Sequence, residues 1–199
     1  MQQLELLKKV IGQLEDRKVD YILCGGIAAS LYRDKPRLTN DVDLAIFYKN
    51  YDDSKAIAKE IIESIGARAS LGWIPQLKEK YIKTMALVIG QFDSENYDAT
   101  VDIILPNLPW VEKAISNGKN HVIDYGFAGI PVITVDDLII AKIFALNVEP
   151  NRFQDLDDLK SIFLSSVELN LPYIKSAMVN YEINVPDTLW DFCPSLLKK

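Results

Sequence analysis

Two aspartates separated by one valine, Asp41-Val42-Asp43, constrain the fold of this chain more than any other feature. They open the segment DVDLAIFY (41–48), whose initial alternation of polar and apolar residues predicts a β-strand. Residues two positions apart in a strand point to the same face, so both carboxylates project from one side while Val42 and Leu44 anchor the other. Two ionised carboxylates this close repel each other unless a cation such as Mg²⁺ neutralises them. The motif predicts a sheet with a metal site on one side; the alternative is an acidic pair at an exposed strand start.

Asp102 and Gly25-Gly26 favour the metal site over that alternative. Asp102 lies in the predicted apolar strand ATVDIIL (99–105), where a buried carboxylate is costly unless it is paired or metal-bound. If the two strands are neighbours, Asp102 completes a three-carboxylate cluster able to hold two metal ions; otherwise it faces solvent at a strand end. Gly25-Gly26 separates an apolar run from a predicted helix, a position that suits phosphate binding through backbone amides, although a plain turn has the same sequence.

The remaining pattern predicts a chain of the α/β (α+β) class, with a small mixed β-sheet flanked by helices and a helical C-terminal part. The expected catalytic core spans 1–134 and the helical part spans 135–199. Residues 66–83 carry no pattern that assigns them to an element, and Trp73 within them is a candidate for stacking on a base. The expected elements are helices over 2–17, from Ile27 to Asp34 and over 52–65, strands over 21–25, 41–48, 84–92 and 99–105, a short helix after Pro109, an extended stretch over 121–134 and three helices from Val135 onward.

Composition narrows the class of protein. Hydrophobic residues make up 49% and charged residues 25% of the 199 residues, as in ordinary soluble globular proteins. Cys24 and Cys193 show neither metal-ligand spacing nor a disulfide framework, which indicates a reducing compartment. No apolar run approaches the roughly 20 residues of a membrane span, so we expect a cytoplasmic protein without membrane contact. The net charge of −6 argues against binding of nucleic acid over a broad surface without sequence preference. A local basic stripe on an acidic protein remains compatible with RNA binding.

Residues 25–44, GGIAASLYRDKPRLTNDVDL, resemble the signature of the nucleotidyltransferase superfamily: a Gly-Gly or Gly-Ser turn, a helix, then Asp-x-Asp on the next strand. The ending RLTNDVDL (37–44) resembles the AbiEii-type and MenT-type branch, which includes toxins of toxin–antitoxin systems. VDDLIIAKIFA (135–145) and RFQDLDDL (152–159) are similar to that branch's Leu-x-x-x-Lys-x-x-Ala and Arg-x-x-Asp-Leu-x-Asp-Leu motifs. The resemblance runs from about residue 20 to 165 and implies a nucleotidyltransferase fold.

The resemblance implies a role in metal binding for the aspartates. Asp41 and Asp43 would be ligands of Mg²⁺ or Mn²⁺. Asp102 is a third carboxylate that some members of the toxin branch lack or place differently, and its presence here favours a general base. Gly26 replaces the serine of many relatives, so only backbone donors remain at that position for phosphate.

The nucleotide-binding residues implied by the same motifs lie further along the chain. Arg37 and Thr39 belong to the motif that ends in Asp-x-Asp, Lys142 would contact the triphosphate, and Asp155 would hold Lys142 or a substrate group. A lysine in so apolar a run must reach a polar cleft or pair with an acid. The spacing from Arg152 favours Asp155 as the site residue, or else a plain ion pair at the start of a helix.

The function implied is transfer of a nucleoside monophosphate from a nucleoside triphosphate to an acceptor hydroxyl, with release of pyrophosphate. The toxin-like motifs suggest the 3′ end of a tRNA as acceptor and an antitoxin protein as partner, whereas the acidic charge suggests a small molecule or a protein hydroxyl. The alternative is a non-catalytic nucleotide-binding or partner-binding module that retains the fold.

Overall fold

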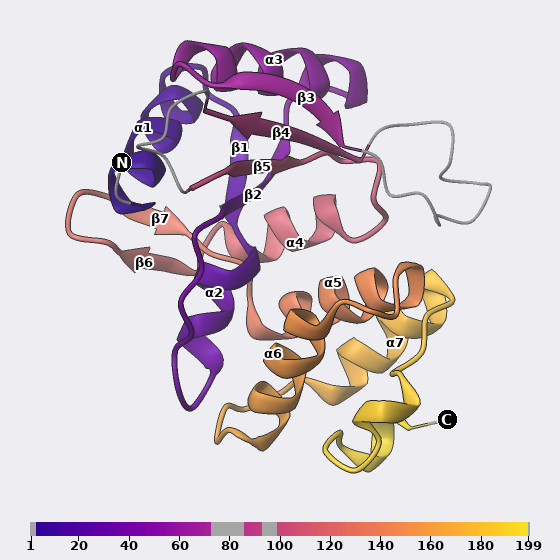
Figure 1. The fold of residues 1–199 in the computed structure, drawn as a ribbon. Coiled ribbons are helices and arrows are strands. Elements are labelled where there is room, and N and C mark those ends of the chain that lie inside the picture. The colour runs from indigo at the N-terminus through magenta and orange to yellow at the C-terminus, as the bar shows by residue number, and fades with distance from the viewer. Residues whose placement is uncertain (1–2, 73–85, 93–98, 199) are drawn as a thin grey trace.

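A five-stranded mixed sheet forms the centre of the N-terminal part of the protein (Figure 1). The structure is a computed structural model that describes residues 3–72, 86–92 and 99–198, so Trp73 lies outside the described residues. Strand β2 pairs in parallel with β5, and every other pairing is antiparallel. The order across the sheet is β1 (Asp20–Leu23), β2 (Val42–Phe47), β5 (Val101–Ile104), β4 (Leu87–Gln91) and β3 (Arg68–Gly72).

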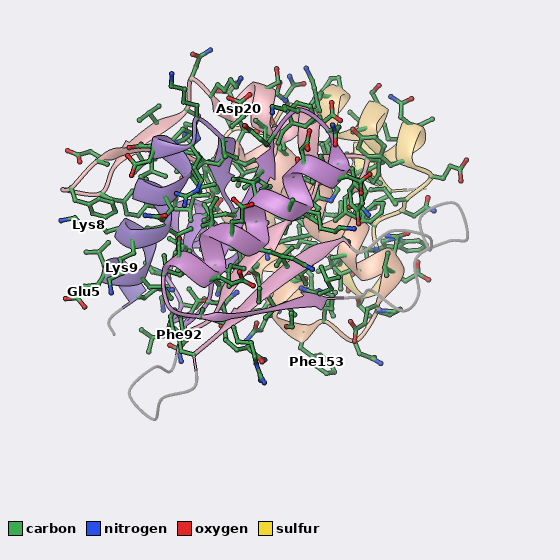
Figure 2. The ribbon with its side chains drawn as sticks, turned by 90° about the horizontal axis from the view of Figure 1, so that it is seen from above. Glu5, Lys8, Lys9, Asp20, Phe92 and Phe153 are labelled. Atoms are coloured by element: carbon green, nitrogen blue, oxygen red, sulfur yellow. The ribbon has the colours of Figure 1, made fainter. Side chains whose placement is uncertain are left out.

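Helices cover both faces of this sheet. Helices α1 (Gln3–Asp16) and α3 (Tyr51–Ser64) pack against each other on one face, and α4 (Val111–Gly118) covers the other (Figure 1). Figure 2, which views the molecule from above, shows α3 crossing the sheet and labels Glu5, Lys8 and Lys9 on α1. A hairpin of β6 (Val122–Asp124) and β7 (Gly129–Pro131) follows α4. The predicted mixed sheet flanked by helices is therefore confirmed.

Strand β2, which contains Asp43, is held in the sheet by buried apolar side chains. Val42, Leu44 and Ile46 share one face of the strand and are fully buried, and Ala45 on the opposite face is fully buried as well. Helix α1 presents its own apolar stripe to the same core, as helical spacing predicts. The buried residues of that stripe are Leu6, Leu7, Val10, Ile11 and Leu14.

The C-terminal part consists of three successive helices, as expected, followed by two short 3-10 turns. Helix α5 (Val135–Val148) is apolar on nearly all sides and is buried between α2 (Gly25–Tyr32), α6 (Phe153–Leu164) and α7 (Leu171–Tyr181). The Thr134 hydroxyl caps α5 by accepting from the Asp137 amide at 3.2 Å. The division at 134/135 remains a prediction.

Two expectations are refined by the structure. The unassigned stretch 66–83 contains β3, whose pairing with β4 supplies the order that its own sequence does not show. The expected extended stretch 121–134 is the β6–β7 hairpin, after which Ile133 donates its amide to the Leu23 carbonyl at 2.9 Å. In the part of the chain that the structure describes, no helix is long and apolar enough to cross a bilayer.

Candidate active site

The turn between β1 and α2 fixes the position of Asp43. Cys24 donates its amide to the Asp43 carbonyl at 2.9 Å, and Gly26 donates its amide to Asp43 Oδ2 at 3.3 Å. Gly25 has φ +62°, and a Cβ at this position would lie 1.9 Å from Asp43 Oδ2. Gly25 is therefore required twice, by its left-handed backbone and by the close approach of the carboxylate.

Replacing Gly25 with alanine is expected to displace Asp43. The left-handed conformation costs an L-residue about 1–2 kcal/mol, and the clash moves a reacting group by enough to reduce turnover about 10²-fold. Gly66→Ala is the matched control, because Gly66 has φ +84° but nothing within 4 Å of the added Cβ. Thermal unfolding and transfer assays of both variants test this: equal activity in the two variants would contradict the role of Gly25.

Asp43 and Asp102 stand side by side on neighbouring strands. They are directly paired in the parallel register of β2 and β5. Burial raises the pKa of Asp102 to about 7, with the charges of Asp43 and Asp41 adding to the shift. Burial and Asp41 also raise the pKa of Asp43, against the opposing effects of the Gly26 amide and Lys142. The strand-end alternative for Asp102 is thereby wrong, since the sheet places its carboxylate beside that of Asp43.

Asp41 lies one residue before β2 and is exposed. Its Oδ1 accepts from the Thr100 hydroxyl at 2.9 Å, which ties it to the residue preceding β5. Asp43 and Asp102 are thus paired near the start of the parallel strands β2 and β5, and Asp41 lies two residues before Asp43 in the chain but outside the three-carboxylate arrangement that the sequence predicts.

The carboxylates fit a divalent cation of the magnesium type. Their donors are all oxygen, and burial, with a further contribution from neighbouring carboxylates, raises the pKa of both Asp43 and Asp102. Within residues 3–72, 86–92 and 99–198, no three His, Cys, Asp or Glu side chains form a ready-made metal cage. Mg²⁺ is usually held by one or two carboxylates together with substrate phosphates, so the pair Asp43 and Asp102 is a sufficient protein contribution.

Lys142 is buried between two carboxylates of α6. Its Nζ lies 2.5 Å from Asp155 Oδ1 and 2.8 Å from Asp158 Oδ2. Burial lowers the pKa of Lys142, but the two carboxylates outweigh it and the pKa is raised. Of the two alternatives predicted for Lys142, a polar cleft or an acid partner, the structure shows both, because this lysine pairs with acids and lines the pocket; Asp155 also accepts from Arg152 Nε.

Arg33 and Arg37 attach the loop before β2 to the same carboxylate of α6. Arg37 binds Asp158 through two nitrogens, at 2.9 and 3.1 Å, and Arg33 binds it at 2.5 Å. Thr39 follows in this loop, and its Oγ1 would lie 2.8 Å from a Cβ added at Gly26. The motif residues Arg37 and Thr39 therefore pack the loop against α2 and α6.

The acidic groups of this network are expected to make stability depend on pH. Despite their burial, Asp155 and Asp158 have lowered pKa values because Lys142, Arg152 and Arg37 stabilise their charged forms. Their contribution to stability is present above the unfolded aspartate pKa of about 3.9 and is lost as pH falls through the lower pKa of the folded state. Urea unfolding from pH 5 to pH 3 should show a shallower decline in Asp158→Asn than in the native sequence; equal declines would contradict this origin.

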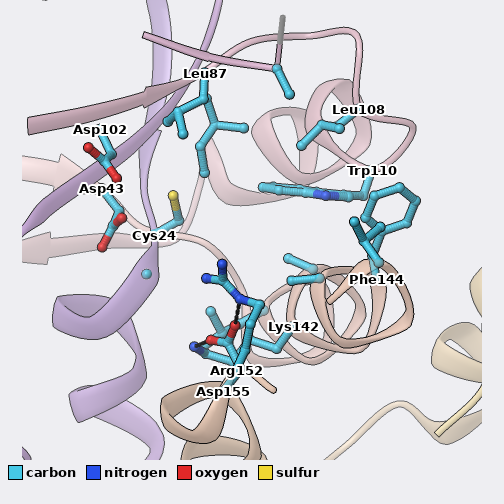
Figure 3. Close-up of a pocket in the computed structure, with 17 residues that line it drawn as sticks. Cys24, Asp43, Leu87, Asp102, Leu108, Trp110, Lys142, Phe144, Arg152 and Asp155 are labelled. Atoms are coloured by element: carbon cyan, nitrogen blue, oxygen red, sulfur yellow. Dashed lines mark hydrogen bonds and ion pairs between the residues drawn. The ribbon is translucent and has the colours of Figure 1, made fainter. Parts of the chain in front are cut away.

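A pocket of about 190 Å³ lies between the carboxylates Asp43 and Asp102 and the ion-paired side chains of Lys142, Arg152 and Asp155 (Figure 3). Among the described residues, its lining includes the predicted Gly25, Asp43, Asp102, Lys142 and Asp155 and omits the predicted Gly26, Arg37, Thr39 and Asp41. The remaining lining residues are Cys24, Ala86, Leu87, Ile104, Leu108, Trp110, Leu138, Ala141, Phe144, Ala145, Val148 and Arg152.

Of the lining residues that the sequence did not predict as site residues, Arg152 and Trp110 are candidates for a function. The guanidinium of Arg152 points into the pocket, whereas the sequence is equally consistent with a helix-start ion pair (Figure 3). For Trp110 the sequence favours a packing role, because scattered tryptophans usually pack in the core. Nothing in the Pro109-Trp110 sequence at the start of a predicted helix indicates that Trp110 lines a pocket.

Comparison with known families identifies this arrangement. The sequence model described as "Nucleotidyl transferase AbiEii toxin, Type IV TA system" matches residues 13–188, most of the chain. The chain belongs to the AbiEii nucleotidyltransferase family. This confirms the resemblance drawn from the three sequence motifs and the expectation of a nucleotidyltransferase enzyme. No curated protein shows a significant sequence match to this AbiEii-family chain.

Solved structures confirm the nucleotidyltransferase fold. ANT(2″)-Ia in complex with adenylyl-2″-tobramycin is similar, with a TM-score of 0.56 and 13% identity over 90% of this chain and 97% of that one. An antigenic nucleotidyltransferase-like protein from Paracoccidioides brasiliensis has a TM-score of 0.54 and 16% identity, over 89% of this chain and 86% of that one. At these identities the likeness concerns the fold.

Proposed function

We propose that this protein transfers a nucleoside monophosphate from a nucleoside triphosphate to an acceptor hydroxyl, with Mg²⁺ or Mn²⁺ as cofactor and release of pyrophosphate. The observation that carries the proposal is the direct pairing of Asp43 with Asp102 at one end of a pocket whose other polar groups include Lys142 and Arg152. Negative groups beside a place for a cation, facing positive groups across a pocket, suit a metal-bound triphosphate.

Asp43 and Asp102, with Asp41 beside them, would hold the metal. When bound, the metal neutralises charge on the α-phosphate and lowers the cost of placing two carboxylates together. Asp102 lines the pocket beside Asp43 and would accept the proton of the acceptor hydroxyl. Gly25 lets the backbone come close to Asp43 and the phosphates, and the Gly26 amide holds Asp43 in place.

Arg152 would neutralise charge on the triphosphate, and Lys142 would hold the acidic side chains beside it. Lys142 is enclosed by Asp155 and Asp158, so it acts mainly by fixing these two acids. Arg152 binds Asp155 through Nε alone among the described residues, which leaves the outer guanidinium nitrogens directed into the pocket (Figure 3). A guanidinium in this position can bind phosphate oxygens through two parallel hydrogen bonds.

The acceptor would be either a tRNA end or a small molecule. Membership of a family described as a toxin of Type IV toxin–antitoxin systems supports an RNA acceptor and an antitoxin protein as partner. The fold is shared with ANT(2″)-Ia, whose structure holds adenylyl-2″-tobramycin, and this supports a small-molecule acceptor.

Transfer of label tests the proposal. The purified protein is incubated with Mg²⁺, each α-labelled nucleoside triphosphate in turn and a total cell extract, with Asp43→Asn in parallel. Label in an acceptor only with the native protein is the expected result, and the RNA or small-molecule fraction that carries it names the acceptor. Absence of label with all four nucleotides, or equal labelling by the variant, would contradict the proposal and favour the non-catalytic binding module.

A further inference from the structure

The pocket has a second end that the proposed reaction does not use. Away from the carboxylates it is lined by apolar and aromatic side chains, with Trp110 and Phe144 facing the cavity from α4's N-terminal side and from α5 (Figure 3). Both are almost fully buried in the protein, at 5% and 4% exposure, with Leu87 and Leu108 beside them. Aromatic and aliphatic side chains form the wall of this end, whereas the other end carries charged side chains.

The indole of Trp110 carries a hydrogen-bond donor without an acceptor. Its Nε1 is buried and has no hydrogen-bond partner within the described part of the chain. A buried tryptophan N–H usually finds a partner, because leaving a buried donor unsatisfied costs about 1–3 kcal/mol. An unsatisfied donor in the wall of a substrate pocket indicates a ligand that brings the acceptor.

The lining of this end of the pocket restricts the part of a ligand that binds there to a ring system. The aromatic and aliphatic walls do not suit a hydroxyl-rich or polycationic acceptor, whose polar groups would lose their hydration there. A planar heterocycle with acceptor atoms on its edge fits both the walls and the donor.

On the basis of the proposed function, we propose that the Trp110–Phe144 end of the pocket binds the base of the nucleoside triphosphate. The base packs against the two aromatic side chains and accepts a hydrogen bond from Trp110 Nε1. Its triphosphate extends towards Asp43, Asp102 and Arg152, which line the same pocket. Trp110 is thus a specificity-determining residue for the nucleotide.

Direct binding measurements separate the base from the phosphates. Affinities for the four nucleoside triphosphates and for inorganic tripolyphosphate are measured by calorimetry in Mg²⁺. Trp110→Phe keeps an aromatic ring but removes the N–H, so it should weaken nucleotide binding about three- to tenfold and leave tripolyphosphate unchanged. Phe144→Leu removes a stacking surface and should weaken nucleotide binding about fivefold or more, again without affecting tripolyphosphate.

Trp190→Phe is the matched control, because Trp190 lies outside the pocket lining at 37% exposure and should change neither affinity. Equal affinity of the native protein for nucleotide and tripolyphosphate would overturn the inference, as would unchanged nucleotide binding in Trp110→Phe. A parallel loss of both ligands in that variant would also overturn it, since the effect would then be structural. These results do not depend on the transfer assay, which alone decides whether the bound nucleotide reacts.

Discussion

Asp43→Asn should remove nucleotidyl transfer while leaving the protein folded. We expect turnover to fall by about 10²–10³-fold, the loss found when one preorganised electrostatic partner of a transition state is removed. The fold should survive because burial already penalises the charge of Asp43, as its raised pKa shows. An asparagine oxygen can still accept the Gly26 amide. Pyrophosphate release and thermal unfolding of the same sample measure both effects.

The control for this variant removes a carboxylate far from the pocket. Asp52 lies in the first turn of α3, with its side chain 85% exposed, so Asp52→Asn should keep full activity. Asp102→Asn should resemble Asp43→Asn, because the two carboxylates are paired across β2 and β5. Full turnover in Asp43→Asn would refute the assignment of the active site.

Asp158→Asn should destabilise the protein by about 3–5 kcal/mol, the cost of breaking a buried ion pair from one side. The Asp158 side chain is fully buried and binds Lys142, Arg33 and Arg37, which come from α5 and from the loop before β2. Loss of its charge leaves the buried cation of Lys142 with Asp155 alone. Urea unfolding at pH 7 measures the change in the free energy of unfolding.

Asp157→Asn is a closely matched control for Asp158→Asn. Asp157 is the adjacent residue, binds Arg33 at 2.8 Å and has a side chain that is 61% exposed. A surface pair of this kind contributes about 0–1 kcal/mol, so the variant should be nearly as stable as the native protein. Similar losses in the two variants would show that the buried network around Asp158 is not what joins the C-terminal helices to the core.

The position of Asp158 also shows which contacts the spacing of residues in the sequence does not predict. The sequence favours Asp155 among the three aspartates of the second motif, and the structure places Asp155 in the pocket lining. Asp158 lies one helical turn further on and binds the same lysine, while Asp157 faces solvent. Which of these faces of α6 meets α5 depends on how the two helices pack, and no local pattern specifies that.

The sequence by itself determined which side chains share a face. Strand alternation predicts Asp43 on one face and Val42 in the core, and the apolar run around Lys142 predicts that this lysine reaches a polar cleft or pairs with an acid. Such conclusions depend only on periodicity and on the cost of burying charge, which hold for any strand or helix.

Only the tertiary structure decided which of these faces meet. The parallel register that sets Asp102 opposite Asp43 joins segments about 60 residues apart in sequence, and the wall formed by Trp110 and Phe144 joins α4's start to α5. Register and helix packing are fixed by the whole core at once, because a shift in either one would expose apolar side chains that are now buried. The residue types of the proposed metal site could therefore be predicted from local sequence, whereas the shape of the pocket could not.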